Sequence, residues 1–300
     1  MPLPDSYVDV AKLARSISLV GVKEKLRRAQ VLREQVLDVV KQYDEVMRLN
    51  VEVTVTEQHW HVFRLKRSVP LPEGLAVIFG DYLNNARSAL DYLAFQLVLV
   101  SGGTPSERTS FPIAKTEQRW KSMAGDSLKG VDRAFLPALM RSQPYRAVNP
   151  ETHPLVRLNE LNNENKHRLL PTTQVAYREL YYLLDLGQAH QFQYTSEIRP
   201  SPKAPMKAGD ILTAMRFTPT LPEGTKGIIG PGTLPTLGFD TPTMGRHGIK
   251  ELPDFVSQVQ RTVESVESLF NEAKLKLPVV PKLSGSTQGT VEEFRIWTHT

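Results

Sequence analysis

One stretch constrains the fold more than any other: residues 80–100, which read GDYLNNARSALDYLAFQLVLV. Its apolar residues recur at alternating spacings of four and three, which places them in one seam of an α-helix. The seam consists of Phe79, Leu83, Ala86, Leu90, Leu93 and Leu97.

A line of polar residues runs along the other side of the same predicted helix. Asp81, Asn84, Ser88 and Asp91 share a helical spacing, and Arg87 and Tyr92 flank them. A solvated helix face usually carries Lys and Glu, and this line has neither. We therefore expect one edge of the helix to lie in the core while the other presents amides, a carboxylate and a guanidinium.

Further helices are predicted over residues 8–19, 22–49 and 251–276, and over the stretch HPLVRLNELNNENKHRLLP, where the helix ends before Pro171. Strand patterns separate them. VEVTVT alternates strictly, and HWHVFRLKRS continues as a second extended piece, so the two form either a hairpin or one bent strand. Residues 174–239 carry more strand patterns between Gly and Pro turns, but TKGIIGPGTLPTLG is rich enough in both to be an edge strand or a loop.

This order of elements predicts an α+β protein: a bundle of about four long helices with a small antiparallel β-sheet packed beside it. Strands do not alternate with crossover helices, which argues against a doubly wound sheet. We expect one domain over residues 1–276, with an insertion at 102–150 and a strand-rich segment at 172–240. A tail follows at 277–300.

Composition excludes several classes of protein. There is no cysteine, so disulfides, thiolate metal sites and cysteine nucleophiles are ruled out. The first twenty residues lack the basic-then-apolar layout of a signal peptide, and no apolar run approaches the length of about twenty residues that spans a bilayer. We expect a cytoplasmic protein with no membrane partner. The net charge of +5 permits anionic partners without requiring them.

The common catalytic and cofactor signatures are missing. The Gly-rich stretches match neither a phosphate-binding loop nor a dinucleotide fingerprint, and there is no GxSxG elbow or HExxH pair. Glu57, His59 and His61 alternate as metal ligands on a strand do, but exposed strand histidines are the simpler interpretation. We predict no cofactor and no metal site.

Arg87 and Asp91 are four residues apart and can pair along the helix. Such a pair either supports the helix and does nothing else, or presents a guanidinium, oriented by the carboxylate, to a phosphate. Asn162 and Asn165 lie on the face of Leu158 in the later helix, so both amides need partners. The polar line of the central helix could supply them.

The tripeptide Lys166-His167-Arg168 places an imidazole between two cations. Two interpretations are open: a basic helix end that interacts with the helix dipole, or a site for proton transfer.

NNARSALDYLAFQL, followed later by LNNENKHRLL, resembles a family of uncharacterised bacterial proteins that pair an RSALDHLA-type helix with a DKHR-type motif. The Arg-x4-His spacing of such helices is also similar to that of HEPN domains. These are helical bundles, often dimeric, and many are metal-independent ribonucleases or partners of nucleotidyltransferases. The resemblance thus implies RNA or a phosphorylated small molecule as ligand, and a homodimer as one assembly.

Carried over to this chain, the motif gives Arg87 the arginine position, whereas the histidine position holds Tyr92. A tyrosine, with a pKa of about 10, cannot serve as a base near neutrality. His167 would have to substitute, which requires the two helices to be adjacent.

Two hypotheses follow. In the first, a HEPN-like protein binds RNA or another phosphorylated ligand and cleaves it: Arg87 holds phosphate, His167 is the general acid or base, and Lys166 stabilises developing charge. Its substrate-binding residues are Asn84, Asp91, Tyr92, Asn162, Asn165 and Arg168. In the second, the protein is a non-catalytic binding or assembly module, and the polar cluster of Arg87, Asp91, Asn165 and His167 is structural.

Overall fold

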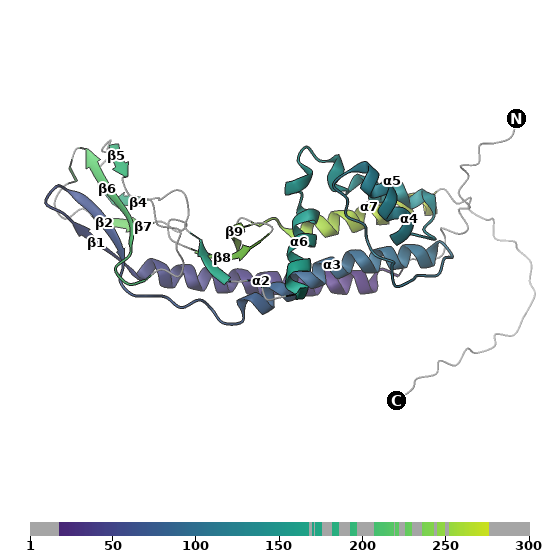
Figure 1. Cartoon of the computed structure of the whole chain (residues 1–300), viewed down its shortest axis with the longest axis horizontal. Helices are drawn as coiled ribbons and strands as arrows, with labels where there is room; N and C mark the ends of the chain where they lie inside the picture. The colour runs from purple at the N-terminus through teal and green to yellow at the C-terminus, as the bar shows by residue number, and fades with distance from the viewer. Residues whose placement is uncertain are drawn as a thin grey trace, which may run out of the picture.

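A computed structural model of this chain describes residues 18–167, 170, 172–175, 182–185, 193–196, 207–218, 220–221, 226–229, 236–242, 245–249 and 252–275. Over these residues the protein is α+β and mostly helical, with antiparallel strands, which confirms the predicted class (Figure 1). No helix in this part of the chain is both long and apolar enough to cross a membrane.

The described helices are α2 (Val20–Leu49), α3 (Leu75–Val100), α4 (Glu117–Ser127), α5 (Leu136–Arg141), α6 (Pro154–His167) and α7 (Phe255–Leu275). The strands are β1 (Val51–Val55), β2 (Trp60–Leu65), β3 (Thr172–Val175), β4 (Tyr182–Asp185), β5 (Gln193–Ser196), β6 (Ile211–Thr218), β7 (Lys226–Ile229), β8 (Thr236–Thr241) and β9 (Gly245–Gly248). Helices α2, α3 and α7 have 30, 26 and 21 residues, and α6 has 14. The expectation of about four long helices is therefore not confirmed.

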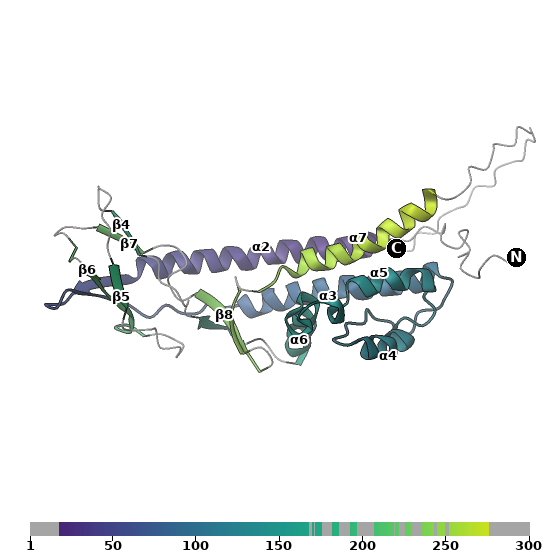
Figure 2. The same ribbon diagram turned by 90° about the horizontal axis from the view of Figure 1, so that it is seen from above.

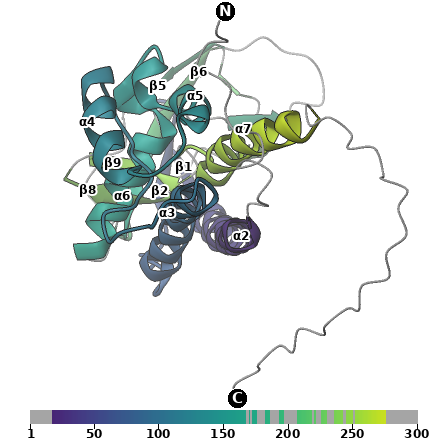
Figure 3. The same ribbon diagram turned by 90° about the vertical axis from the view of Figure 1, so that its right-hand side faces the viewer.

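The body of the molecule is built on α2 and α3, which run side by side (Figure 2). Their directions are opposite, because Tyr92 near the end of α3 meets Gly21 at the start of α2, while Tyr82 shares a pocket with Arg33. The predicted seam of α3 is buried at every position, and so is that of α2 from Ala29 to Met47. α7 packs on both helices (Figure 3).

The predicted insertion, residues 102–150, contains α4, α5 and two 3₁₀ turns, Arg133–Phe135 and Pro144–Arg146. In the end-on view α4, α5 and α6 lie together on the side of α3 that faces away from α2 (Figure 3). α6 packs against both α3 and α7. The insertion contacts the polar side of α3 at Arg87 and Asp91, whereas Asp81 and Asn84 stay exposed.

The strands form three hydrogen-bonded groups: β1-β2-β6-β5, β3-β8-β9 and β4-β7. The four-stranded sheet lies at the end of α2 (Figures 1 and 2). The sheet β3-β8-β9 lies beside the bundle, as expected, because β8 packs on α2 and its Phe239 stacks on Phe79 of α3. β1 and β2 form a hairpin, which decides between the two sequence readings. Its turn carries no Gly. The positive φ, of 60°, is taken by His59.

Other expectations are corrected or lie outside the described residues. Residues 236–238, the end of the stretch expected to be an edge strand or a loop, belong to β8 at the centre of its sheet, whereas residues 226–229 of the same stretch form β7 in a two-stranded pair. Pro235 precedes β8, so no proline interrupts the ladder. The predicted helix at 8–19 and the tail at 277–300 lie outside the described residues, except for residues 18 and 19.

His153 caps the start of α6. Its Nδ1 accepts the N–H of Leu155 (3.2 Å), and its carbonyl oxygen accepts the N–H groups of Val156 (2.9 Å) and Arg157 (3.1 Å). Burial lowers the pKa of His153 below its ordinary value of 6.5, and the nearby charge of Arg261 lowers it further. The neutral ring is therefore the form that the fold prefers.

We expect the protein to lose stability as the pH falls below 6.5. The pKa of His153 is lower in the folded chain than in the unfolded one, so its contribution is complete above pH 6.5 and is lost as the pH falls through the lowered value. The thermal midpoint should drop between pH 7.5 and 5.5, and His153→Asn, which keeps a capping side chain, should reduce that drop. An unchanged pH dependence in His153→Asn would contradict this role. His61, whose pKa burial also lowers, should leave a residual slope.

Candidate functional site

Arg87 and Asp91, one turn apart on α3, together hold the backbone of Phe111. Nη2 of Arg87 lies 3.0 Å from Oδ1 of Asp91 and donates to the carbonyl oxygen of Phe111 (2.8 Å). The N–H of Phe111 donates to the same Oδ1 of Asp91 (2.9 Å). The two charged groups thus bind the donor and the acceptor of one residue in the insertion, whose side chain is itself buried.

The guanidinium is largely removed from solvent. The side chain of Arg87 is 12% exposed and that of Asp91 is 34% exposed. Burial lowers the pKa of Arg87, and the carboxylate of Asp91 opposes that shift. Nη1 of Arg87 is buried and has no hydrogen-bond partner among the described residues. A charge in this position is costly without its partner, so Arg87 depends on Asp91.

Gln143 completes the hold on the same segment of chain. Its side chain is 1% exposed; Oε1 accepts the N–H of Ala114 (3.1 Å) and Nε2 donates to the carbonyl oxygen of Pro112 (3.0 Å). The carbonyl oxygen of Ala114 accepts the N–H of Tyr145 (3.1 Å). Residues 111–114 thus bond as a strand does, although their partners are mostly side chains.

Sequence reasoning missed Gln143 and Phe111. One signal for Gln143 was available: a lone glutamine that ends the apolar helical stretch FLPALMRSQ just before Pro144. Nothing in the spacing linked it to residues 112 and 114, because that contact depends on how the insertion folds back.

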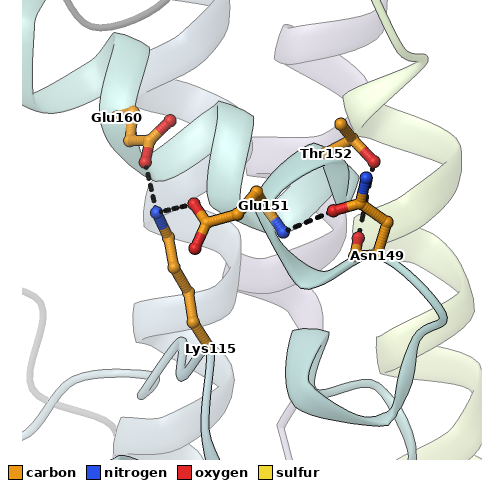
Figure 4. A network of polar contacts seen from close by, with 5 residues as sticks. All are labelled: Lys115, Asn149, Glu151, Thr152 and Glu160. Atoms are coloured by element: carbon orange, nitrogen blue, oxygen red, sulfur yellow. Dashed lines mark hydrogen bonds and ion pairs between the residues drawn. The ribbon is translucent and has the colours of Figure 1, made fainter.

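Lys115, which follows Ala114, joins the insertion to α6 (Figure 4). Its Nζ pairs with Glu151 and lies 2.9 Å from Oε1 of Glu160 on α6. These hydrogen bonds, that to Glu151 first, raise the pKa of Lys115. Oδ1 of Asn149 fixes the loop by accepting the N–H of Glu151 (3.2 Å). The residues just after Phe111 are therefore tied to α6 as well as to α3.

The two predicted amides of α6 differ in burial, and Asn165 lies where this helix meets α3. Asn162 is 1% exposed and Asn165 is half-buried, and neither Oδ1 has a hydrogen-bond partner in the described part of the chain. Asn165 lies against Gly80: a Cβ added to that glycine would stand 2.4 Å from Oδ1 of Asn165. Gly80 precedes Arg87 by seven residues, about 10 Å along the helix axis.

The remaining predicted site residues lie elsewhere. Lys166 and His167 are exposed at the end of α6, and no hydrogen bond or ion pair joins either to Arg87 within the described chain. Arg168 lies outside the described residues. Tyr92 is 46% exposed beside Gly21, with Nζ of Lys25 5.7 Å from its ring centroid. Asn84 is exposed.

The structure also holds a pocket that sequence reasoning did not find. It is small, with a cavity volume of about 70 Å³, is open to solvent, and none of the predicted site residues lines it. Burial, and next the charge of Asp254, raise the pKa of Tyr82 in its wall. The lining residues are Arg33, Val36, Leu37, Phe79, Tyr82, Ile249, Leu252 and Pro253.

Metal-binding geometry is missing from the described residues, where no group of three or more His, Cys, Asp or Glu side chains could hold an ion. Glu57 and His59 fall in the hairpin turn and only His61 is in a strand, so these three residues do not form the alternating row that their spacing indicated.

Asp91→Ala should lower the free energy of unfolding by about 1–3 kcal/mol, because the N–H of Phe111 loses its acceptor and Arg87 loses its counter-charge. Asp91→Asn retains an oxygen acceptor and should lose less. Urea denaturation of the full chain gives both values. The matched control is Lys121→Ala, which breaks the exposed Lys121–Glu117 pair of α4 and should change stability by less than about 0.5 kcal/mol. Equal effects of Asp91→Ala and Lys121→Ala would contradict the role of Asp91.

Gly80→Ala should be destabilising in the wild-type chain and stabilising, by up to about 1 kcal/mol, in an Asn165→Ala background. The added methyl group meets the amide of Asn165, whereas the shorter side chain frees that space and leaves the helix propensity gain of alanine. A double-mutant cycle followed by urea denaturation measures this coupling. Additive effects would show that the two residues are not in contact.

Comparison of the chain with protein-family models, with curated proteins and with solved structures finds no match.

Proposed function

We propose that this protein is a non-catalytic binding or assembly module, in which the pair of Arg87 and Asp91 is structural. The observation that supports this most is that both side chains are already bound to the backbone of Phe111. A guanidinium that holds a phosphate needs donors directed at the ligand, whereas Nη2 of Arg87 points to a carbonyl oxygen and Asp91.

Three independent contacts on residues 111–115 support a structural role for this polar cluster. Arg87 and Asp91 hold Phe111 to α3, Gln143 holds Pro112 and Ala114, and Lys115 holds the segment to α6 through Glu160. The first two satisfy polar groups that folding removes from water, whereas the Lys115 contact is partly exposed. These contacts explain the buried polar cluster without a ligand. The binding function is therefore assigned to the exposed surfaces of the protein.

A second candidate is the HEPN-like protein that binds RNA or another phosphorylated ligand, with metal-independent cleavage as its reaction. One observation favours it: Lys166 and His167 are exposed at the end of α6, where a phosphate could reach them. In this alternative the contact of Arg87 with Phe111 would have to open when the ligand binds.

One set of variants separates the two candidates. Wild type, Arg87→Ala and His167→Ala are incubated with labelled RNA in EDTA, and their thermal midpoints are measured in parallel. A structural Arg87 predicts no cleavage by wild type, a lowered midpoint for Arg87→Ala and an unchanged one for His167→Ala. RNA cleavage by wild type that disappears in His167→Ala, with the midpoint unchanged, would overturn the proposal and favour the second candidate.

A further inference from the structure

The strand β1 forms an open edge of the four-stranded sheet. The strand order is β1-β2-β6-β5, so among the described strands β1 pairs with β2 alone, on one side. Every residue of β1 after Val51 is exposed, with Val53 at 40% and Val55 at 59%. The strand contains no Lys, Pro or bulge, features that protect an edge from pairing with another strand, and Glu52 is its one charged residue.

The hydrogen bonds at both ends of the hairpin define which backbone groups face outward. The N–H of Thr56 donates to the carbonyl oxygen of Trp60 (2.9 Å), and the N–H of Lys66 donates to that of Asn50 (2.8 Å). In an antiparallel pair, bonded and non-bonded positions alternate, so residues 50, 52, 54 and 56 bond to β2. The N–H and C=O groups of Val51, Val53 and Val55 therefore point to the free edge.

This edge is complementary to itself. When two copies of β1 are placed antiparallel about a two-fold axis at Val53, that residue faces its own copy and Val51 faces Val55 of the second chain. Glu52 then faces Thr54 of the second copy, so like charges are not directly opposed. All three outward-facing residues of each strand form hydrogen-bonded pairs, about six bonds in total. An axis at Glu52 would instead oppose two carboxylates, and an axis at Thr54 would pair fewer residues of β1.

We propose that β1 is an interface for a second copy of this chain, joined edge to edge about a two-fold axis at Val53 into one eight-stranded sheet. The sheet lies at the opposite end of the molecule from the helices α4, α5 and α7 (Figures 1 and 2), so two copies can approach at this edge with those helices far apart. The valine side chains of both strands lie on one face, where each covers exposed apolar surface of the other. This inference is independent of the role given to Arg87 and Asp91.

The experiment measures the molar mass of the full chain by light scattering after size exclusion, at tens of micromolar protein. Wild type should have the mass of two chains. Val53→Lys places two like charges opposite each other at the axis and should give the mass of one chain. The matched control is Thr54→Lys, an exposed position on the same strand that would face Glu52 of the second copy. It should retain the dimer and strengthen it at low salt.

A second measurement tests the register, using the lack of native cysteine. Val53→Cys should form a disulfide-linked dimer on mild oxidation, because paired residues of adjacent strands lie within disulfide reach. Glu52→Cys, one residue away, should cross-link much more slowly. A monomeric wild type, a Val53→Lys dimer as tight as wild type, or faster cross-linking of Glu52→Cys would each overturn the proposal. So would a monomer whose β1 binds a foreign extended peptide.

Discussion

A buried backbone segment that no described strand pairs with needs other hydrogen-bond partners, and residues 111–114 find most of theirs among side chains. Arg87 and Asp91 serve Phe111 from α3, and Gln143 serves Pro112 and Ala114 from within the insertion. Leaving such groups unpaired would cost about 1–3 kcal/mol each. The path of the insertion over α3 therefore depends on these three side chains.

This requirement also explains why one helix carries two kinds of polar residue. Asp91 and Arg87 face the insertion and are partly or largely buried, whereas Asn84 is exposed and Tyr92 lies beside α2. The polar line read from the sequence is thus divided among different neighbours. At Gly80, α3 has no side chain at all, and α6 comes close enough for Asn165 to fill the space.

The sequence was a good guide where burial repeats with the period of the helix. It predicted α2, α3 and α7, although α7 begins four residues later than predicted, and the spacing of Arg87 and Asp91 predicted their ion pair. It could not predict what that pair holds, because Phe111 follows twenty residues later and reaches α3 only through the fold of the insertion. The sequence does not distinguish a hairpin from one bent strand at residues 51–65. The turn residue with a positive φ is His59, and not the Gly or Asn that usually indicates such a turn. Asn162 is buried as its position on the face of Leu158 predicts, but its Oδ1 has no hydrogen-bond partner in the described part of the chain.

The length of α2 has a mechanical consequence. Its 30 residues run without a break from the contact with Tyr92 to the four-stranded sheet, a distance of about 45 Å. A rod of that length acts as a lever: a tilt of about 5° at the end packed in the helical body displaces the other end by roughly 4 Å. Small rearrangements around Gly21 would therefore produce larger displacements at the sheet. A displacement of the sheet would in turn tilt α2 within the helical body.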